Sequence, residues 1–299
     1  MIYFYEHKSM SSLSPQEIDL LGFNGVRKFA IERGLDPMNV FDNIKSLETE
    51  IKNMGNKPFD MSSGKNLEMF NRWVDRYIDY FNNCAVHDKQ AYIILGNIAS
   101  GKTTLAKDLE QPTSSIIIDP DKFKMGEETK KGYFEGFTSL YHEPTDRERM
   151  QDPCSDAGKQ ILKNSAELGL NIILPKAAYS LEKLEKQLQV LVEADYDIHL
   201  IQIEAPMTDC ADRNYYRYLI KEYQRIKEIS VGQNNHNPML GKTHGRFVPV
   251  SIITNIGDNS YNTFIKAIKK GKFASYSAFY NDSMIRNEQI DIETMKGFE

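Results

Sequence analysis

The stretch that decides the fold runs from Ala91 to Leu109 and reads AYIILGNIASGKTTLAKDL. Its first part, residues 91–95, is apolar or aromatic without interruption and predicts a buried strand. The next residues, Gly96 to Thr103, match the pattern G-x-x-x-x-G-K-[ST] and lead into a helical run. A strand, this glycine-containing loop and a helix in succession indicate a phosphate-binding loop, the P-loop.

The residue types of this loop suit a chain of phosphate groups. Glycine lets the backbone approach a ligand closely because it has no Cβ atom, and the start of the following helix attracts anions through its partial positive charge. We expect Lys102 to reach the β- and γ-phosphates of a nucleotide, and the Thr103 hydroxyl to bind Mg²⁺. The predicted nucleotide-binding residues are therefore Gly96, Asn97, Ala99, Ser100, Gly101, Lys102, Thr103 and Thr104.

Composition sets the broad class of the protein. The chain has 299 residues, of which 40% are hydrophobic and 26% charged, which is enough for one large domain or for a domain with an appendage. A net charge of -5 gives no general attraction to nucleic acid or to an anionic membrane. The cysteines, Cys84, Cys154 and Cys210, form no C-x-x-C motif and predict neither a disulfide framework nor a zinc site. Without an apolar signal segment or an 18-residue apolar run, we expect a cytoplasmic protein.

The residues before the P-loop predict helices. Residues 15–33 and 37–54 each have helix start and stop signals, and we assign residues 1–63 to an N-terminal helical extension. A third helix carries an apolar stripe at spacings of 3 and 4, made of Leu67, Phe70, Val74, Tyr77 and Phe81. We place it in a P-loop domain that covers residues 64–299.

The rest of the chain alternates strands with helices. Further strands are predicted at residues 114–118, 171–175, 198–203 and 273–280, with a helix at 261–270 between the last pair and a peripheral tail from Asn281. Such alternation is typical of a mostly parallel sheet with helices on both faces. The predicted fold class is therefore α/β: a P-loop kinase-like, doubly wound sheet with an N-terminal helical extension.

Carboxylates follow the second predicted strand. Asp119 and Asp121 stand at its carboxyl end, where α/β sheets bind their ligands, and Lys124 follows closely. Residues 125–155 are polar and aromatic, so we expect an acceptor-binding insertion there. A later helix that starts near Met207 carries Arg213 and Arg217, which share a face because they are four residues apart.

In these motifs the chain resembles the zeta toxin family, P-loop kinases of bacterial toxin–antitoxin systems that phosphorylate the sugar of a UDP-activated amino sugar. The resemblance covers about residues 66–283 and rests on markers in a fixed order: GNIASGKTT, IIIDPDKFK, GLNIIL, Ala205-Pro206 leading to Arg217-Tyr218, GRFVP, and a helix followed by KKGKF and a strand that ends in FYND.

The resemblance implies roles for residues at matching positions. The P-loop lysine and threonine match the family's phosphate- and Mg²⁺-binding pair. Asp121 matches the base toward the acceptor hydroxyl, with Lys124 at the family's spacing, and Asp119 lies beside them in the predicted substrate site. Arg217 and Arg246 match two arginines that clamp the transferring phosphates. General chemistry agrees, since a positioned carboxylate accepts a proton and arginines neutralise the charge of the phosphoryl group.

The sequence also departs from the family pattern. The family has a glutamate and then an arginine just after the third strand, where they bind the sugar nucleotide. This chain has Pro175-Lys176 and Tyr179-Ser180 there. Kinase chemistry survives these changes, but the identity of the acceptor does not follow from the resemblance.

Three functional hypotheses therefore stand. The first is an ATP- or GTP-dependent kinase of the zeta type that acts on a hydroxyl of a nucleotide sugar or a related metabolite. The second is a P-loop kinase for another acceptor, namely a nucleoside, a nucleotide cofactor or a polynucleotide end; residues 125–180 lack the basic excess that a polynucleotide calls for. The third is a nucleotide-binding regulator without catalysis.

The resemblance also implies an antitoxin, either residues 1–60 in cis or a separate chain, although residues 1–60 could serve only to stabilise the kinase domain.

Overall fold

The computed structural model describes residues 61, 64–129, 132–140, 151–177, 180–214, 217, 248, 250–281 and 288–290. The predicted domain boundary after residue 63 and the two helices expected before it lie outside these residues. Arg246 lies outside them as well.

A six-stranded sheet in the order β2-β5-β1-β6-β7-β8 forms the centre of the domain. Every pair from β2 to β7 is parallel, and only β8 runs antiparallel to its neighbour β7. This confirms the mostly parallel α/β sheet. The strands are β1 (Gln90–Gly96), β2 (Ile116–Ile117), β5 (Ile172–Lys176), β6 (Asp197–Glu204), β7 (Ser275–Tyr280) and β8 (Glu288–Ile290).

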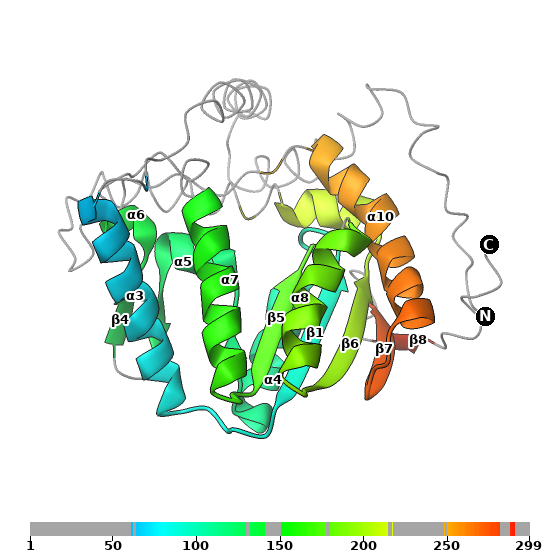
Figure 1. Ribbon diagram of the computed structural model, residues 1–299. Coiled ribbons are helices and arrows are strands. Elements are labelled where there is room, and N and C mark those ends of the chain that lie inside the picture. The colour runs from blue at the N-terminus through cyan, green and yellow to red at the C-terminus, as the bar shows by residue number, and fades with distance from the viewer. Residues whose placement is uncertain are drawn as a thin grey trace, which may run out of the picture.

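Helices cover both faces of this sheet (Figure 1). The side chains of β1 show why: Ile93 packs in a large cluster with residues of the helices on one face, whereas Ile94 points the other way and packs with Ala106 of a single helix. A strand with apolar residues on both faces must be covered on both, which accounts for its continuous apolar run. The helices on the first face are α3 (Gly64–Asn82), α7 (Gln151–Glu167), α8 (Leu181–Glu193) and α10 (Val250–Lys270), and the helix on the second is α4 (Lys102–Thr113).

An aromatic cluster joins α3 to the segment that follows β2. Trp73 is buried, its Nε1 donates a hydrogen bond to the carbonyl of Glu135 at 2.6 Å, and its ring meets Phe123 edge-on. Phe123 belongs to α5 (Pro120–Met125), the short helix that carries Asp121. The predicted apolar stripe of α3 is thus mostly buried, except for Leu67 at 47% exposure, and it fixes the position of α5.

Several elements differ from the sequence prediction. The residues expected to form an acceptor-binding insertion contain an antiparallel hairpin of β3 (Gly126–Thr129) and β4 (Gly132–Glu135), followed by α6 (Phe137–Leu140). Helix α10 starts at Val250 rather than near residue 261. The tail that was expected to be peripheral contributes β8 to the sheet.

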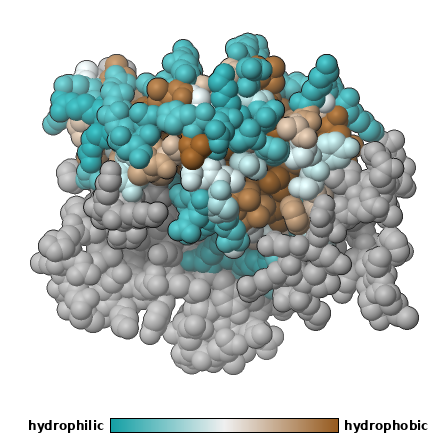
Figure 2. All heavy atoms as spheres, turned by 90° about the horizontal axis from the view of Figure 1, so that it is seen from below, coloured by the Kyte–Doolittle hydropathy of each residue, from teal (hydrophilic) through white to brown (hydrophobic). Residues whose placement is uncertain are grey.

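The surface of the described part is mostly hydrophilic in the view from below, with smaller apolar areas between the polar side chains (Figure 2). The large apolar side chains that are exposed come from separate elements, for example Leu67 of α3 and Val192 of α8. Within the ranges that the structure describes, no helix combines the length and the apolar character needed to cross a membrane.

Candidate active site

The P-loop leaves β1 at a position where only glycine fits. Gly96 has a φ of 150°, and a Cβ atom there would lie 2.5 Å from the carbonyl oxygen of Ile203 on the neighbouring strand β6. Gly101 has a φ of 112°, and a Cβ atom there would collide with the side-chain amide of Asn281. Gly96 is therefore required by backbone angle and by space, and Gly101 by its backbone angle, since the Asn281 side chain could move aside.

The end of the loop leaves the start of α4 open. Gly101 is the N-cap residue and offers no side chain to the first N–H groups of the helix. Lys102 is the first residue of α4 and is partly buried. Its Nζ donates hydrogen bonds to the carbonyl of Gly96 at 3.0 Å and to that of Asn97. The lysine side chain thus folds back onto the P-loop, whose phosphate ligand it is expected to bind.

Other side chains of the loop hold the loop itself. Asn97 is buried, accepts a hydrogen bond from the N–H of Ile98 at 2.7 Å and donates one to the sulfur of Met207 at 3.2 Å. The Ser100 side chain is buried, and its Oγ has no hydrogen-bond partner among the residues that the structure describes. Asn97 thus shapes the loop: its side chain engages the N–H of Ile98 and its carbonyl accepts from the N–H of Ser100 at 3.2 Å, which leaves the other backbone amides of the loop to contact phosphate. Among the remaining residues of the predicted set, Ala99 is buried, Thr103 partly buried and Thr104 exposed.

The two aspartates after β2 differ in their contacts and in their exposure to solvent. Asp119 is buried and caps α5, where its Oδ1 accepts a hydrogen bond from the N–H of Asp121 at 3.0 Å. The side chain of Asp121 is 36% exposed and forms an ion pair of 3.5 Å with Lys124, whose side chain is only 10% exposed. The structural capping role thus belongs to Asp119, and the carboxylate of Asp121 stays accessible to a ligand.

Strand order brings these groups to one edge of the sheet. Strand β5 lies between β1, which leads into the P-loop, and β2, which leads into Asp119 and Asp121. The N–H of Ile118 still bonds to the carbonyl of Ile173 at 2.9 Å, so the chain follows β5 up to the aspartates. The order reverses at β1, because β2 and β5 lie on one side and β6 and β7 on the other. Ligands of open α/β sheets bind at such a switch point, outside the carboxyl ends of the strands.

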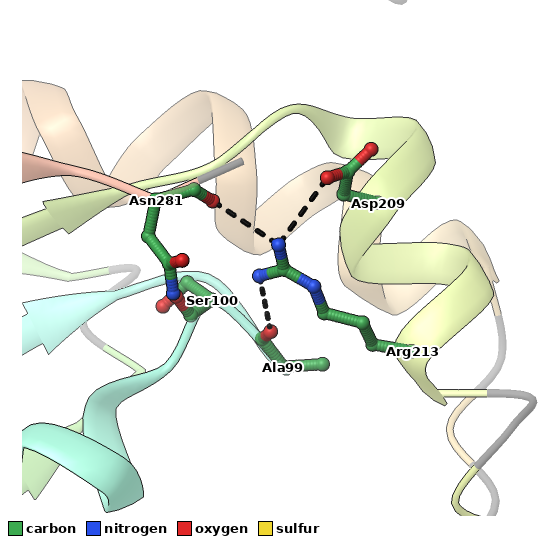
Figure 3. Close-up of polar contacts among 5 residues, drawn as sticks. All are labelled: Ala99, Ser100, Asp209, Arg213 and Asn281. Atoms are coloured by element: carbon green, nitrogen blue, oxygen red, sulfur yellow. Dashed lines mark hydrogen bonds and ion pairs between the residues drawn. The ribbon is translucent and has the colours of Figure 1, made fainter. Parts of the chain in front are cut away.

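A network around Arg213 supports the P-loop from outside (Figure 3). Its guanidinium donates to the carbonyl of Ala99 at 3.4 Å, to the carbonyl of Asn281 at 3.3 Å and to the carboxylate of Asp209 at 3.2 Å. Asn281 in turn donates through Nδ2 to the carbonyl of Ser100 at 2.7 Å. The helical residues 207–214, the loop and the end of β7 are thereby joined at the loop's outer side.

Arg213 and Asn281 were not among the predicted site residues. The sequence offered one signal for Arg213, its spacing of four from Arg217, and one for Asn281, its place in the family marker FYND, but neither assigned a contact to the P-loop. Arg217 is helical and exposed. Since Arg246 lies outside the described residues, the predicted pairing of Arg217 with Arg246 around the phosphates stays a prediction.

A buried carboxyl group lies behind the loop. Glu204 ends β6, one residue after Ile203, and its Oε1 accepts a hydrogen bond from Nε2 of Gln202 at 2.6 Å. Burial raises the pKa of Glu204 to about 7, and the hydrogen bond from Gln202 opposes this only in part. The strand next to β1 therefore ends in a carboxyl group whose pKa lies near neutral pH.

The donor set suits a magnesium ion that arrives with a nucleotide. Within the described ranges, no group of three or more His, Cys, Asp or Glu side chains could hold a metal ion. Mg²⁺ usually keeps several waters and is bound through one or two protein oxygens together with substrate phosphates. Thr103, in the first turn of α4, fits this pattern.

Comparison with models of protein families shows the family to which the chain belongs. The family model described as "Zeta toxin" matches residues 75–282, and the chain belongs to the zeta toxin family. It is therefore a phosphotransferase of the P-loop kinase class, as the motifs and the resemblance predicted. No curated protein sequence gives a match to this chain.

Solved structures with a related fold are distant. A protein of the PezAT toxin–antitoxin system of Streptococcus pneumoniae is 19% identical, with a TM-score of 0.49 over 72% of this chain and 78% of its own. The AvrRxo1-ORF1:-ORF2 complex with ATP gives 15% identity and a TM-score of 0.46 over 75% of this chain and 65% of its own. Deoxyadenosine kinase from M. mycoides with bound dATP gives 12% and 0.29 over 69% of this chain and 94% of its own.

The Arg213 network makes a first testable prediction. Replacing Arg213 by Met removes the donors to the carbonyls of Ala99 and Asn281, so we expect ATP affinity to fall by about tenfold, which corresponds to about 1.4 kcal/mol. Arg213→Lys should not restore it, because a single ammonium cannot reproduce the forked contact. Isothermal titration calorimetry measures both variants. Arg72→Met, which removes an exposed arginine of α3, is the control. Unchanged ATP affinity in Arg213→Met would show that the network is dispensable.

Glu204 makes a prediction about pH. Because the pKa of Glu204 in the folded protein lies above the ordinary glutamate value of 4.5, the folded protein binds more protons than the unfolded chain between about pH 4.5 and 7. Stability should therefore fall as pH rises through this window, and the loss is complete above pH 7. Glu204→Gln should remove this loss and melt about 2–4 °C higher at pH 8, the shift that about 1 kcal/mol gives in a domain of this size. Thermal melts at pH 4.5 and 8 test it, with the exposed Glu193→Gln as control; equal behaviour of Glu204→Gln and wild type at pH 8 would contradict it.

Proposed function

We propose that this protein transfers the γ-phosphate of ATP or GTP to a hydroxyl group of a small acceptor. The observation that carries the proposal is the arrangement at the carboxyl edge of the sheet, where the P-loop after β1 and the accessible Asp121 after β2 are separated by one strand. This spacing leaves the region above β5 for the transferring phosphate. Membership of the zeta toxin family supports the same chemistry.

In the proposed mechanism the P-loop holds the donor. Backbone N–H groups of the loop and the open start of α4 bind the phosphate chain. Lys102 exchanges its bonds to the carbonyls of Gly96 and Asn97 for bonds to phosphate oxygens. This exchange needs only a rotation of the lysine side chain. It brings a positive charge to the oxygens on which negative charge accumulates during transfer.

Asp121 acts as the base toward the acceptor. The acceptor hydroxyl oxygen forms a bond to the γ-phosphorus, the bond from that phosphorus to the β–γ bridging oxygen breaks, and the hydroxyl proton passes to the Asp121 carboxylate. The ion pair with Lys124 orients the carboxylate for this task. Arg217 and Arg246 neutralise the charge on the transferred group. Magnesium, when bound at Thr103 and the phosphates, supplies further charge neutralisation.

For the acceptor we propose a nucleotide sugar of the UDP-amino-sugar type or a related metabolite. Other hydroxyl acceptors, such as a nucleoside, a nucleotide cofactor or a polynucleotide end, are the alternative, and a non-catalytic regulator is the second alternative. The test incubates the protein with labelled ATP or GTP and a panel of UDP-sugars, nucleosides and dinucleotides. Transfer to one class identifies the acceptor. Nucleotide binding without transfer to any of them contradicts the kinase proposal and supports the regulator.

The Asp121→Asn variant distinguishes a role in phosphoryl transfer from a role in ATP binding. We expect the variant to keep its affinity for ATP and to lose transfer by about 10² or more, the usual scale for a positioned general base. Lys102→Ala should instead abolish transfer, because the phosphates of the donor nucleotide lose their contact with the lysine. The variant should keep the fold, as circular dichroism would show. Equal losses of ATP affinity and rate in Asp121→Asn would make Asp121 a metal or structural ligand and would remove the base from the mechanism.

An antitoxin is the proposed protein partner, either residues 1–60 in cis or a separate chain. The solved structures named above include a protein of the PezAT toxin–antitoxin system and AvrRxo1-ORF1 together with AvrRxo1-ORF2. Deleting residues 1–60 should give a fragment with higher kinase activity and greater toxicity on expression if these residues inhibit. Unchanged activity, or an aggregated fragment, would assign them a structural role instead.

A further inference from the structure

A chain of polar side chains crosses the sheet at the edge where its parallel strands begin. Gln90 is the first residue of β1, Asp197 the first of β6 and Ser275 the first of β7. His199 of β6 pairs in register with Ser275. The P-loop follows the other end of β1, after Gly96, so this polar cluster is separate from the nucleotide site.

The hydrogen bonds of the cluster all run in one direction. The amide nitrogen of Gln90 donates to the Asp197 carboxylate at 3.2 Å and to the Asp88 carbonyl at 3.2 Å, and both of these groups only accept. The amide oxygen of Gln90 therefore faces Nε2 of His199 at 2.9 Å, so Nε2 carries the proton. Because a neutral imidazole has one N–H, its Nδ1 accepts the hydroxyl proton of Ser275 at 2.8 Å.

The imidazole ring of His199 is held in this orientation and kept neutral. Tyr92 of β1 stacks on it, with ring centroids 4.8 Å apart and an interplanar angle of 15°. Burial lowers the pKa of His199, and the charge of Asp197 opposes this only in part. A neutral ring keeps the lone pair of Nδ1 available. His199 is thus a base already oriented toward the hydroxyl of Ser275.

Ser275 is exposed to solvent, as a residue that reacts with a small molecule must be. Helix α4, on the same face of the sheet, packs against β1, β2 and β5 rather than over the start of β7. Hydrogen bonds at an exposed position add little to stability, because water competes for the same groups. Their chemical effect is larger, since a hydroxyl beside a base that a third group orients has the arrangement of an activated nucleophile.

We propose that Ser275 is a nucleophile that takes an acyl group from an activated ester, with His199 as its base. The Ser275 oxygen forms a bond to the carbonyl carbon of the ester, and its proton passes to Nδ1 of His199. The bond from that carbon to the leaving oxygen then breaks, and Nδ1 returns the proton to this oxygen. The products are an acyl-serine and an alcohol or phenol.

The neighbouring groups set the class of ester. Gln90 accepts from Nε2 while the ring is charged, and the nearby carboxylate of Asp197 stabilises that charge. The cluster supplies a nucleophile and a base, so it suits esters with a good leaving group rather than amides. The step needs no nucleotide and is independent of the proposed kinase function.

Acetylation by p-nitrophenyl acetate tests the proposal on the full chain. The reaction is stopped with acid, and peptide mass spectrometry follows the acetyl group on each peptide, with exposed lysines as the internal reference. We expect Ser275 to react faster than the other serines, and His199→Gln to slow this step by about 10², the scale of a positioned base. Ser277→Ala, which removes a serine on the same face of β7, should leave the rate unchanged.

A thiol at the same position gives a second measurement. Ser275→Cys places a thiol beside Nδ1, and a neighbouring imidazole favours the reactive thiolate. This thiol should react with iodoacetamide about tenfold faster than Cys84, which is an exposed cysteine of the same chain. The advantage should disappear when Ser275→Cys is combined with His199→Gln.

Other results decide against the proposal. An unmodified Ser275 while the lysines react, or acetylation that is equally fast in His199→Gln, overturns it. A thiol in Ser275→Cys that reacts no faster than Cys84 also overturns it, since the imidazole would then not activate its neighbour. Thermal melting shows whether each variant is folded. If His199→Gln is unfolded, the comparison with Cys84 decides alone, because it leaves His199 unchanged.

Discussion

The close approach of β1 and β6 at Gly96 is the constraint on which the site depends. At this point the backbone of the P-loop passes so near the carbonyl of Ile203 that a Cβ atom would lie 2.5 Å from it. The parallel pairing of the two strands runs up to this residue, so the loop starts from a fixed place and direction. Everything that follows, from the turn through Gly101 to the open start of α4, takes its position from that contact.

The support of the loop comes from residues distant in sequence. Arg213 and Asn281 hold the carbonyls of Ala99 and Ser100, and they do so from the two segments that follow β6 and β7. The two groups of a peptide point in opposite directions, so the bond from Asn281 to the Ser100 carbonyl turns the N–H of Gly101 away from Asn281, whereas the N–H of Ser100 donates to the carbonyl of Asn97 at 3.2 Å within the loop. The outer network and the phosphate-binding face are thus parts of one arrangement, even though only the face has a sequence motif.

Much of the fold could be predicted because its signals are local. Continuous apolar runs marked β1, β5 and β6, which are covered on both faces, and the P-loop motif fixed the turn into α4. Helix α10 was underestimated because Asn255, Gly257 and Asn259 weaken its helical pattern, whereas Ile253, Ile256 and Phe264 bury the face that stabilises it. Tertiary packing there overrides local propensity. The β3–β4 hairpin has a polar sequence without alternation, so no period-2 signal was available.

The residues of the site also fall into those with a local sequence signal and those without one. Residues joined by a local motif, such as Gly96, Gly101 and Lys102, could be assigned from spacing alone. The place of Asp119 and Asp121 after a strand could be predicted, but the capping role of Asp119 and the exposure of the Asp121 carboxylate needed the observed contacts. The contacts of Arg213 depend on which distant segments meet beside the P-loop. No spacing rule within one segment could have supplied them.

The central claim is that the backbone of this loop binds the phosphate chain of a nucleotide. The most direct measurement is ¹H–¹⁵N NMR of the isotope-labelled full chain, with the Gly101 amide assigned by triple-resonance experiments and titrated with ATP and with adenosine. The claim predicts that the Gly101 resonance shifts with ATP and not with adenosine, because phosphate oxygens are the partners of this amide. A Gly101 resonance that stays in place while ATP binds, or that shifts equally with adenosine, would contradict it.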